Sequence, residues 1–166
     1  METWKKIAVG TGIGTALLAG ATWLSRINKT AVNLEVVPTA KIHQLAFNGV
    51  TIRVDIQLKN PTRSSFKLKY PFIKLRYKDE SIGSSQVVNQ DIVLPAFGEA
   101  QIENVLIKIP LLNLFTSSGK VFTAINNNEL IQIQIDILTT IDIGIKKLPF
   151  TKSEKITLRK QKDNSA

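Results

Sequence analysis

The sequence has no cysteine and only one histidine, His43, and one methionine. Without cysteine the chain can form no disulfide, no thiolate metal site and no thiol nucleophile. With one histidine it cannot build a metal cage from several imidazoles, and any nucleophile–histidine–acid arrangement would depend on His43 alone. These absences exclude several common enzyme classes. They leave the compartment open, because secreted proteins can also lack cysteine.

Acidic residues are scarce relative to basic ones, since 22 Lys and Arg against 13 Asp and Glu give a formal charge of +9. Residues 1–29 carry four basic groups and one acidic group, and residues 151–166 carry five and two. The body between them, with thirteen and ten, is nearly balanced. Basic flanks around such a body favour contact with an anionic surface over DNA binding, so we expect no nucleic-acid partner.

The longest apolar feature is an uncharged stretch of 18 residues, Ile7–Leu24. A helix of about 17–25 apolar residues spans the hydrocarbon core of a bilayer. Tryptophan and basic residues favour the headgroup layer. Such residues flank the stretch on both sides, namely Trp4, Lys5, Lys6, Trp23 and Arg26. The pattern predicts a single-pass transmembrane helix within residues 1–29, with these side chains as membrane-interface anchors and the following domain outside the cytoplasm.

Two alternatives to this anchor stay open. A cleaved signal peptide would also begin with Lys5 and Lys6, and the small residues at 19–21 would supply a cleavage site, although the apolar stretch continues past them. The segment could instead pack against protein. Gly10 and Gly14 have the G-x-x-x-G spacing that lets two membrane helices approach closely, so they form a candidate helix-pairing face for a homo-oligomer.

After Leu24 the period of the apolar residues changes to two, which is typical of β-strands. Alternating segments cover residues 50–59, 66–70 and 73–77, and residues 130–147 are predicted as one long strand with a bend near Thr139-Thr140. Shorter candidate strands are Val32–Val37, Ile42–Phe47, Gln86–Val93 and Ile102–Ile109. A shift of apolar parity between Ile102 and Val105 predicts a β-bulge. Leu111–Ile125 fits a short helix, and the whole pattern predicts an antiparallel β-sandwich over residues 30–160, followed by a polar tail at 161–166.

Four short motifs follow one another along the chain, namely an alternating strand that ends in Asn60-Pro61, the later Pro71-Phe72, a Pro-x-x-Gly turn at residues 95–98, and a strand that ends in Pro110. Together they resemble the water-stress and hypersensitive-response (WHy) domain of the atypical, type 2 late-embryogenesis-abundant proteins. The resemblance covers roughly Val32 to Arg159 and departs from the family at Asp79-Glu80, where a turn glycine is missing. It implies an immunoglobulin-like or fibronectin-III-like sandwich with a non-catalytic binding or stress-protective role.

A basic contact patch is the main candidate site. Residues 63–78 contain six basic side chains and no acid, and strand parity places Lys67 with Lys69 on one face. The same parity groups the side chains Lys74, Arg76 and Lys78. If the two segments pair across Tyr70-Pro71, the five residues form one positive patch suited to anionic lipid or an acidic protein. The alternative is a solvated strand face whose lysines discourage edge pairing.

The remaining ionisable residues give no catalytic arrangement. Asp136 and Asp142 lie on the polar face of one predicted strand, about 20 Å apart if it is straight, which is too far for paired carboxylates. We expect both to be solvated, and we interpret His43 as a structural strand residue rather than a ligand or base. The sequence therefore predicts no catalytic residue, no metal site, no cofactor and no small-molecule substrate.

Together these features predict a non-catalytic, membrane-tethered binding or structural β-sandwich whose partner is a protein or an anionic lipid surface. The alternative is a structural or accessory component of a large assembly, such as a virion or an envelope complex. In that case the apolar segment would pack within a protein sheath or enter a membrane during delivery.

Overall fold

The structure is a computed structural model that describes residues 33–110, 112, 123–124, 127 and 129–158. Glu35–Ala166 form one compact unit, and Met1–Leu34 are assigned to another. The predicted N-terminal helix, the polar tail and most of the predicted helical insertion Leu111–Ile125 lie outside the described residues. In the part that the structure describes, no helix is long and apolar enough to cross a membrane.

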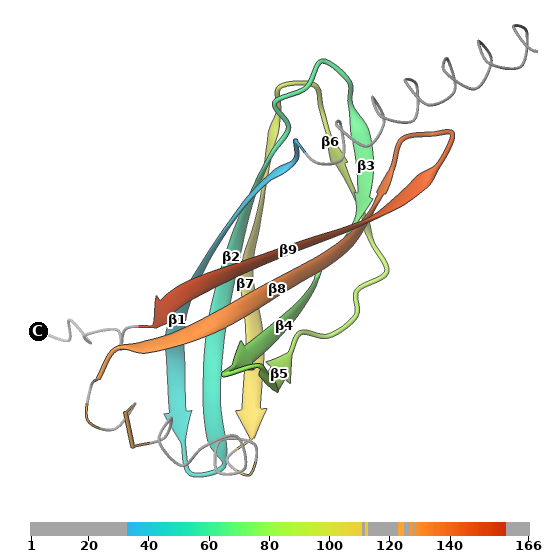
Figure 1. The fold of residues 1–166 in the computed structure, drawn as a ribbon. Coiled ribbons are helices and arrows are strands. Elements are labelled where there is room, and N and C mark those ends of the chain that lie inside the picture. The colour runs from blue at the N-terminus through green and yellow to red at the C-terminus, as the bar shows by residue number, and fades with distance from the viewer. Residues whose placement is uncertain (1–32, 111, 113–122, 125–126, 128, 159–166) are drawn as a thin grey trace, which may run out of the picture. The chain divides into compact units, whose positions relative to one another are not determined.

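The described residues form an all-β unit. Its strands are β1 (Glu35–Ala46), β2 (Gly49–Lys59), β3 (Phe66–Lys69), β4 (Phe72–Tyr77), β5 (Glu80–Ser84), β6 (Asp91–Leu94), β7 (Glu99–Pro110), β8 (Ile131–Asp142) and β9 (Lys147–Leu158). All of their pairings are antiparallel. They make two sheets, one with the order β1-β2-β7 and one with the order β5-β4-β8-β3-β6, to which β9 adds beside β8 (Figure 1). The predicted antiparallel sandwich is confirmed.

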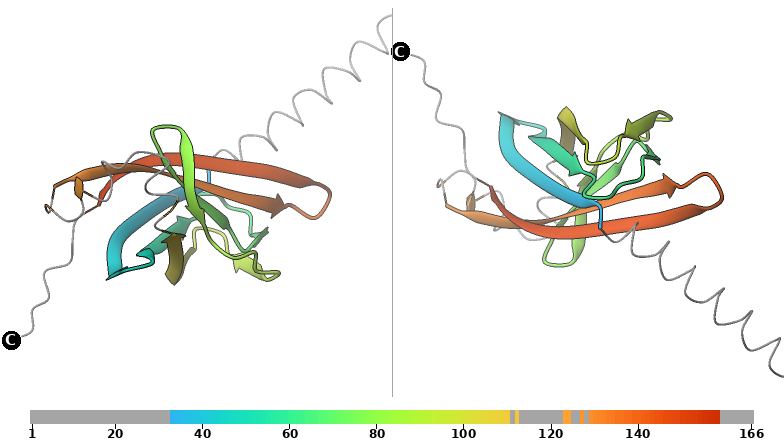
Figure 2. Two further views of the ribbon diagram at one scale, coloured as in Figure 1. Left: turned by 90° about the horizontal axis from the view of Figure 1, so that it is seen from below. Right: turned by 90° about the horizontal axis from the view of Figure 1, so that it is seen from above.

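The core lies between the two sheets, where the alternating apolar residues of both turn inward. Strand β2 buries five of them, namely Val50, Ile52, Val54, Ile56 and Leu58. Strand β8 buries Ile131, Ile133, Ile135, Ile137 and Ile141. The long hairpin β8–β9 runs across the three-stranded sheet at an angle, as two views confirm (Figures 1 and 2). The sheets approach closely at Gly83, where an added Cβ would lie 3.2 Å from side-chain atoms of Ile107 and Ile109 on β7.

Two predicted strand boundaries were wrong. The candidates Val32–Val37 and Ile42–Phe47 belong to one strand, β1, which passes through Pro38 without interruption. Proline is tolerated there because β1 is an edge strand, so its missing N–H faces no partner in the sheet. Candidate Gln86–Val93 is also too long, because β6 begins only at Asp91.

The predicted single long strand over residues 130–147 is two strands. Strand β8 runs through Thr139-Thr140 and ends at Asp142, and the chain reverses over residues 143–146 into β9. The apolar alternation continues to Ile145, but that side chain is exposed. Alternation alone therefore did not locate the end of the strand.

The predicted β-bulge between Ile102 and Val105 is confirmed. Opposite it, Val54 pairs with Val105 and Ile56 pairs with Ile102, so β7 contains one residue more than β2 over this stretch. Asn104 adopts a φ of 60° in the bulge, and its backbone N–H donates to the Asp55 carboxylate at 2.7 Å. Asparagine tolerates this left-handed conformation better than most residues.

The turn that lacks the expected glycine keeps a hairpin geometry. Lys78 and Asp79, between β4 and β5, have φ angles of 47° and 70°. Two consecutive positive φ angles are typical of a type I′ hairpin turn, for which glycine or asparagine is usual. This hairpin therefore turns at two residues that carry side chains, and both bear the steric cost of a positive φ.

Candidate functional site

The outer face of the six-stranded sheet carries the predicted basic contact patch. Strands β3 and β4 do not pair with each other, contrary to the hypothesis, because both pair with the same edge of β8 and lie end to end along it. Lys67 faces Asp142 across this edge, Lys74 faces Asp136, and Arg76 faces Gln134. Neither β3 nor β4 is a sheet edge, so their basic residues do not serve to discourage edge pairing.

The patch is partly neutralised by acids that the sequence did not group with it. Lys69 Nζ lies 2.6 Å from the Asp91 carboxylate on β6. Arg76 reaches Asp136 at 3.6 Å, and it also donates to the backbone carbonyl of Asp79 at 2.9 Å.

The other three patch lysines are not neutralised in this way. Lys78 lies over the ring of Tyr77, with Nζ 5.5 Å from the centroid. Lys67, Lys74 and Lys78 form no ion pair with any residue that the structure describes. The face therefore presents separate positive positions rather than one continuous patch.

Asp136 corrects the expectation that the strand acids are solvated. Its exposed fraction is 8% although it points to the outer face, because β4 and β9 cover it from both sides. Gln134 Nε2 donates to it at 2.8 Å and Ser153 Oγ at 2.7 Å. Burial raises the pKa of this carboxyl, but these hydrogen bonds and the Arg76 guanidinium outweigh burial and leave the pKa below its usual range. Asp136 is a structural acid that joins three strands.

A hollow of about 210 Å³ lies where β3, β6, β8 and β9 meet. Its lining consists of Lys67, Leu68, Lys69, Asp91, Thr140, Asp142 and Lys147. The hydrogen bond from Lys69, together with the charges of Lys67 and Lys147, outweighs desolvation and lowers the pKa of Asp91. Lys147 could not be predicted as a neighbour of these lysines, because it is remote from them in the chain and comes close only through the β8–β9 pairing. Because its lining contains three lysines and two acids, this hollow is suited to bind a polar group that carries negative charge.

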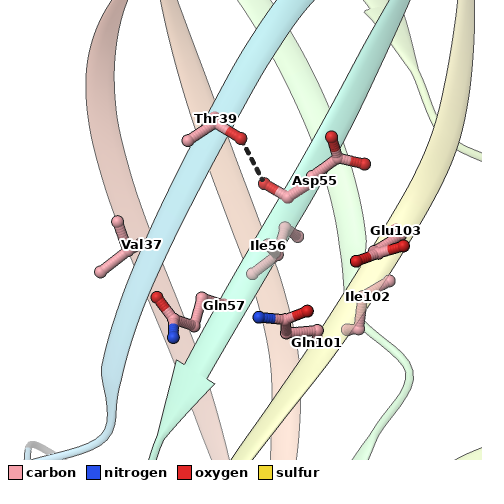
Figure 3. A pocket seen from close by; sticks show the side chains of 8 residues that line it. All are labelled: Val37, Thr39, Asp55, Ile56, Gln57, Gln101, Ile102 and Glu103. Carbon is pink, nitrogen blue, oxygen red and sulfur yellow. Dashed lines mark hydrogen bonds between the residues drawn. The ribbon is translucent and has the colours of Figure 1, made fainter.

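A second hollow, of about 220 Å³, lies on the outer face of the three-stranded sheet (Figure 3). Its lining includes Thr39, Asp55, Gln57, Gln101 and Glu103 (Figure 3). The Asp55 carboxylate is engaged by Arg53 Nε at 3.0 Å and by the Asn104 N–H. Desolvation raises the pKa of Asp55, but the hydrogen bonds from Asn104 and Arg53 outweigh it and hold the pKa below its usual range. The carboxylate thus fixes the β-bulge.

Asn60 of the Asn-Pro motif lies at one end of the sandwich with an exposed fraction of 2%. Its Nδ2 donates to the carbonyl oxygens of Ser64 and Pro95, both at 2.8 Å. Its Oδ1 accepts from the backbone N–H of Thr62 at 3.0 Å and from the Thr62 hydroxyl at 2.6 Å. All of its polar atoms are therefore used to join the turn after β2 to the turn before β7. Asn60 of the Asn-Pro motif therefore has a structural role.

Other candidate residues can be placed only in part. The interface anchors Trp4, Lys5, Lys6, Trp23 and Arg26 and the helix-pairing residues Gly10 and Gly14 lie outside the described residues. His43 is exposed at a register shift of β1, between Ile42 and Gln44. Among the residues that the structure describes, no group of three His, Asp or Glu side chains could hold a metal ion.

No protein-family model and no curated protein matches the sequence. Among solved structures, the chain is similar to a protein from Archaeoglobus fulgidus, with 13% identity and a TM-score of 0.52 over 78% of this chain and 98% of that chain. It is similar to a protein from Arabidopsis thaliana with 17% identity and a TM-score of 0.52, over 79% and 85%. A late embryogenesis abundant protein is 17% identical over 96% and 91%, with a TM-score of 0.39 that is too low to support a structural argument. At these identities the likeness shows the fold alone.

Proposed function

We propose that this chain is a non-catalytic β-sandwich module that is tethered to a membrane by its N-terminal segment. The observation that carries the tether is the uncharged 18-residue stretch Ile7–Leu24, bordered by tryptophan and basic residues. A single-pass helix would hold the sandwich within reach of the bilayer surface, outside the cytoplasm in the proposed orientation. The partner is then a protein or a lipid surface at that membrane.

The non-catalytic part of the proposal is supported by how the described polar groups are used. Asn60, Asp55 and Asp136 each direct their polar atoms to neighbouring strands or turns. Catalytic acids need to converge on a cleft where a substrate can reach them. Here these three polar side chains hold turns, a β-bulge and three neighbouring strands together, as expected of a stable scaffold.

The finer fold class and the protective role belong to the same proposal. A three-stranded sheet packed on a larger antiparallel sheet supports an immunoglobulin-like or fibronectin-III-like assignment. A stress-protective role is what the resemblance to the water-stress domain implies. Fold alone does not fix a role, so this part depends on that resemblance.

Fractionation of the full chain tests the tether. The wild-type chain is compared with a variant in which Leu17→Arg and Leu18→Arg place two charges in the apolar stretch, each unfavourable by about 2.5–3.5 kcal/mol near the bilayer centre. We expect only the wild-type chain to stay with membranes through carbonate and high-salt washes. If both chains are extracted alike, the tether is refuted. If the wild-type chain instead runs with a large particle in fixed ratio without detergent, it is a component of an assembly.

A further inference from the structure

Two apolar side chains protrude at one end of the sandwich. Phe97, in the turn between β6 and β7, has an exposed fraction of 67%, and Ile145, in the turn between β8 and β9, has one of 77%. Both turns belong to the same end, because the last residues of β6 and β8 both flank the beginning of β3 (Figure 1). Exposed apolar side chains mark a site of contact when they gather on one part of the surface beside polar residues, rather than when they are scattered singly.

The turn holds the backbone of Phe97 in a strained conformation. Phe97 has a φ of 53°, a left-handed conformation that is unfavourable for a bulky residue. Its N–H donates to the Thr62 carbonyl at 3.0 Å, and the Gly98 N–H donates to the Pro95 carbonyl at 3.0 Å. The buried Asn60 amide also donates to that Pro95 carbonyl. The fold therefore keeps an exposed phenylalanine in a turn where its positive φ is unfavourable. A surface turn without a binding role does not require a bulky apolar side chain at such a position.

Basic residues lie behind these apolar tips. Lys67 and Lys147 flank Asp142 on neighbouring strands, one or two residues from the β8–β9 turn, and both are exposed. Lys146, inside the turn, extends the positive set, whereas Lys69 is paired with Asp91. Apolar tips in front of lysines match a bilayer surface, where acyl chains lie just below anionic headgroups.

The chain also enters the domain at this end. Glu35, the first residue of β1, pairs with Lys59, the residue before Asn60. Ten residues, 25–34, separate the end of the apolar stretch from Glu35. Even fully extended they span at most about 33–36 Å, which limits how far this end can move from the membrane if the tether holds.

We propose that this end of the sandwich docks onto the anionic lipid surface of the bilayer, with Phe97 and Ile145 entering the interface and Lys67 and Lys147 contacting headgroup phosphates and carboxylates. The inference rests on the proposed tether, which keeps the end close to lipid. The opposite end of the sandwich also has an exposed phenylalanine, Phe47 in the β1–β2 turn. It lies more than ten residues along the chain from Glu35, where the chain enters the domain, and so it is remote from the proposed docking end. Docking by this end leaves Phe47 in water.

The absence of cysteine allows a direct test on the full chain. Phe97→Cys, Ile145→Cys and, as the matched control, Phe47→Cys each receive an environment-sensitive fluorophore at the only thiol in the chain. Each labelled chain is added to vesicles of equal parts phosphatidylcholine and phosphatidylserine, and sedimentation of the same sample reports the tether. We expect blue-shifted emission and protection from an aqueous quencher at positions 97 and 145, and neither at position 47.

The outcomes separate docking from tethering. Chains that sediment with vesicles while positions 97 and 145 stay in water keep the tether and overturn the docking. Chains that do not sediment and show no shift overturn both, whereas a shift at 97 with sedimentation that a high-salt wash reverses removes only the tether. Equal shifts at 47 and 97, or protection at 97 without vesicles through a second copy of the chain, also overturn the proposal.

Charge substitutions test the headgroup contacts separately. Lys67→Gln and Lys147→Gln are compared with Lys108→Gln, an exposed lysine near the opposite end on β7. One lysine near an anionic leaflet contributes about 1 kcal/mol, so each of the first two changes should lower the ratio of docked to undocked label about fivefold. The control should leave the ratio unchanged. An equal effect of all three substitutions would contradict docking by this end.

Discussion

The side chain of Asn60 provides the sharpest test of how this fold is held together. Asn60→Ala removes four hydrogen bonds from a site with 2% exposure, and it leaves the Ser64 and Pro95 carbonyls and the Thr62 N–H without that partner. At about 1 kcal/mol for each bond, we expect a loss of about 3–4 kcal/mol. That is a large part of the roughly 5–15 kcal/mol by which such domains are stable. Urea unfolding followed by far-UV circular dichroism measures the loss.

Two further variants separate lost donors from lost volume. Asn60→Asp keeps the shape and both bonds from Thr62, but it turns a carboxylate oxygen toward the two carbonyls that Nδ2 contacts at 2.8 Å. We expect this variant to be at least as unstable as Asn60→Ala at pH 7. Its deficit should shrink as pH falls, because the protonated carboxyl can donate one bond again. Thr62→Val removes the hydroxyl, whose proton is shared between Asn60 Oδ1 and the Ser64 carbonyl, and should cost about 1 kcal/mol.

An exposed asparagine serves as the control for these variants. Asn89 is exposed in the segment between β5 and β6, and Asn89→Ala should change the free energy of unfolding by less than about 0.5 kcal/mol. The reasoning is refuted if Asn60→Ala is as mild as Asn89→Ala. It is also refuted if Asn60→Asp is as stable as the wild type at neutral pH.

Three other predictions concern one acid and two turns. Asp136→Asn should destabilise the domain by about 1–2 kcal/mol at pH 7. The pKa of Asp136 is lower in the folded state than its ordinary value of 3.8, so its charge stabilises the domain fully above pH 3.8. As the pH falls through the folded-state pKa, the difference in unfolding free energy between the wild type and Asp136→Asn should vanish. Unfolding curves at several pH values would show this. Gly49→Ala would place a Cβ on the Ile109 backbone carbonyl oxygen of β7 and should lower the stability of the domain. The loss should be larger than that of Gly144→Ala, where φ is 85° but nothing lies within 4 Å of the added Cβ. Equal melting temperatures of the two variants would contradict this prediction. Replacing Lys78 and Asp79 by Asn and Gly should stabilise the turn by about 1 kcal/mol, and an unchanged or lower urea midpoint would count against the type I′ assignment.

The sequence predicted the elements whose signal is local. The alternation of β2 and the parity shift at Ile102–Val105 located a strand and a bulge correctly, because each follows directly from which side chains are buried. The same signal failed at Asp142, since Ile143 and the exposed Ile145 continue the alternation into the turn. It also could not show that β1 continues through Pro38, which depends on β1 being an edge strand.

The candidate site was predicted less well than the fold, for a physical reason. Its geometry depends on which strands are neighbours, and pairing over about 60 residues of separation leaves no local pattern. Strand β8 lies beside both β3 and β4, so Lys67 faces Asp142 rather than a lysine of β4. Lys147 and the burial of Asp136 follow from the same arrangement. The basic side chains themselves were found, but the acids that neutralise some of them were not.

The position of β8 has a consequence for how the chain is made. Strands β3 and β4 are synthesised early, yet each completes its pairing only when residues 131–142 arrive, and β9 must follow to cover the other edge of β8. The nascent chain therefore exposes the apolar sides of β2, β3 and β4 until residues 131–158 have been synthesised. Such non-local closure is slow and open to aggregation. Premature termination anywhere before β9 should yield a product that quality-control systems remove, so shortened forms of this protein should not accumulate in cells.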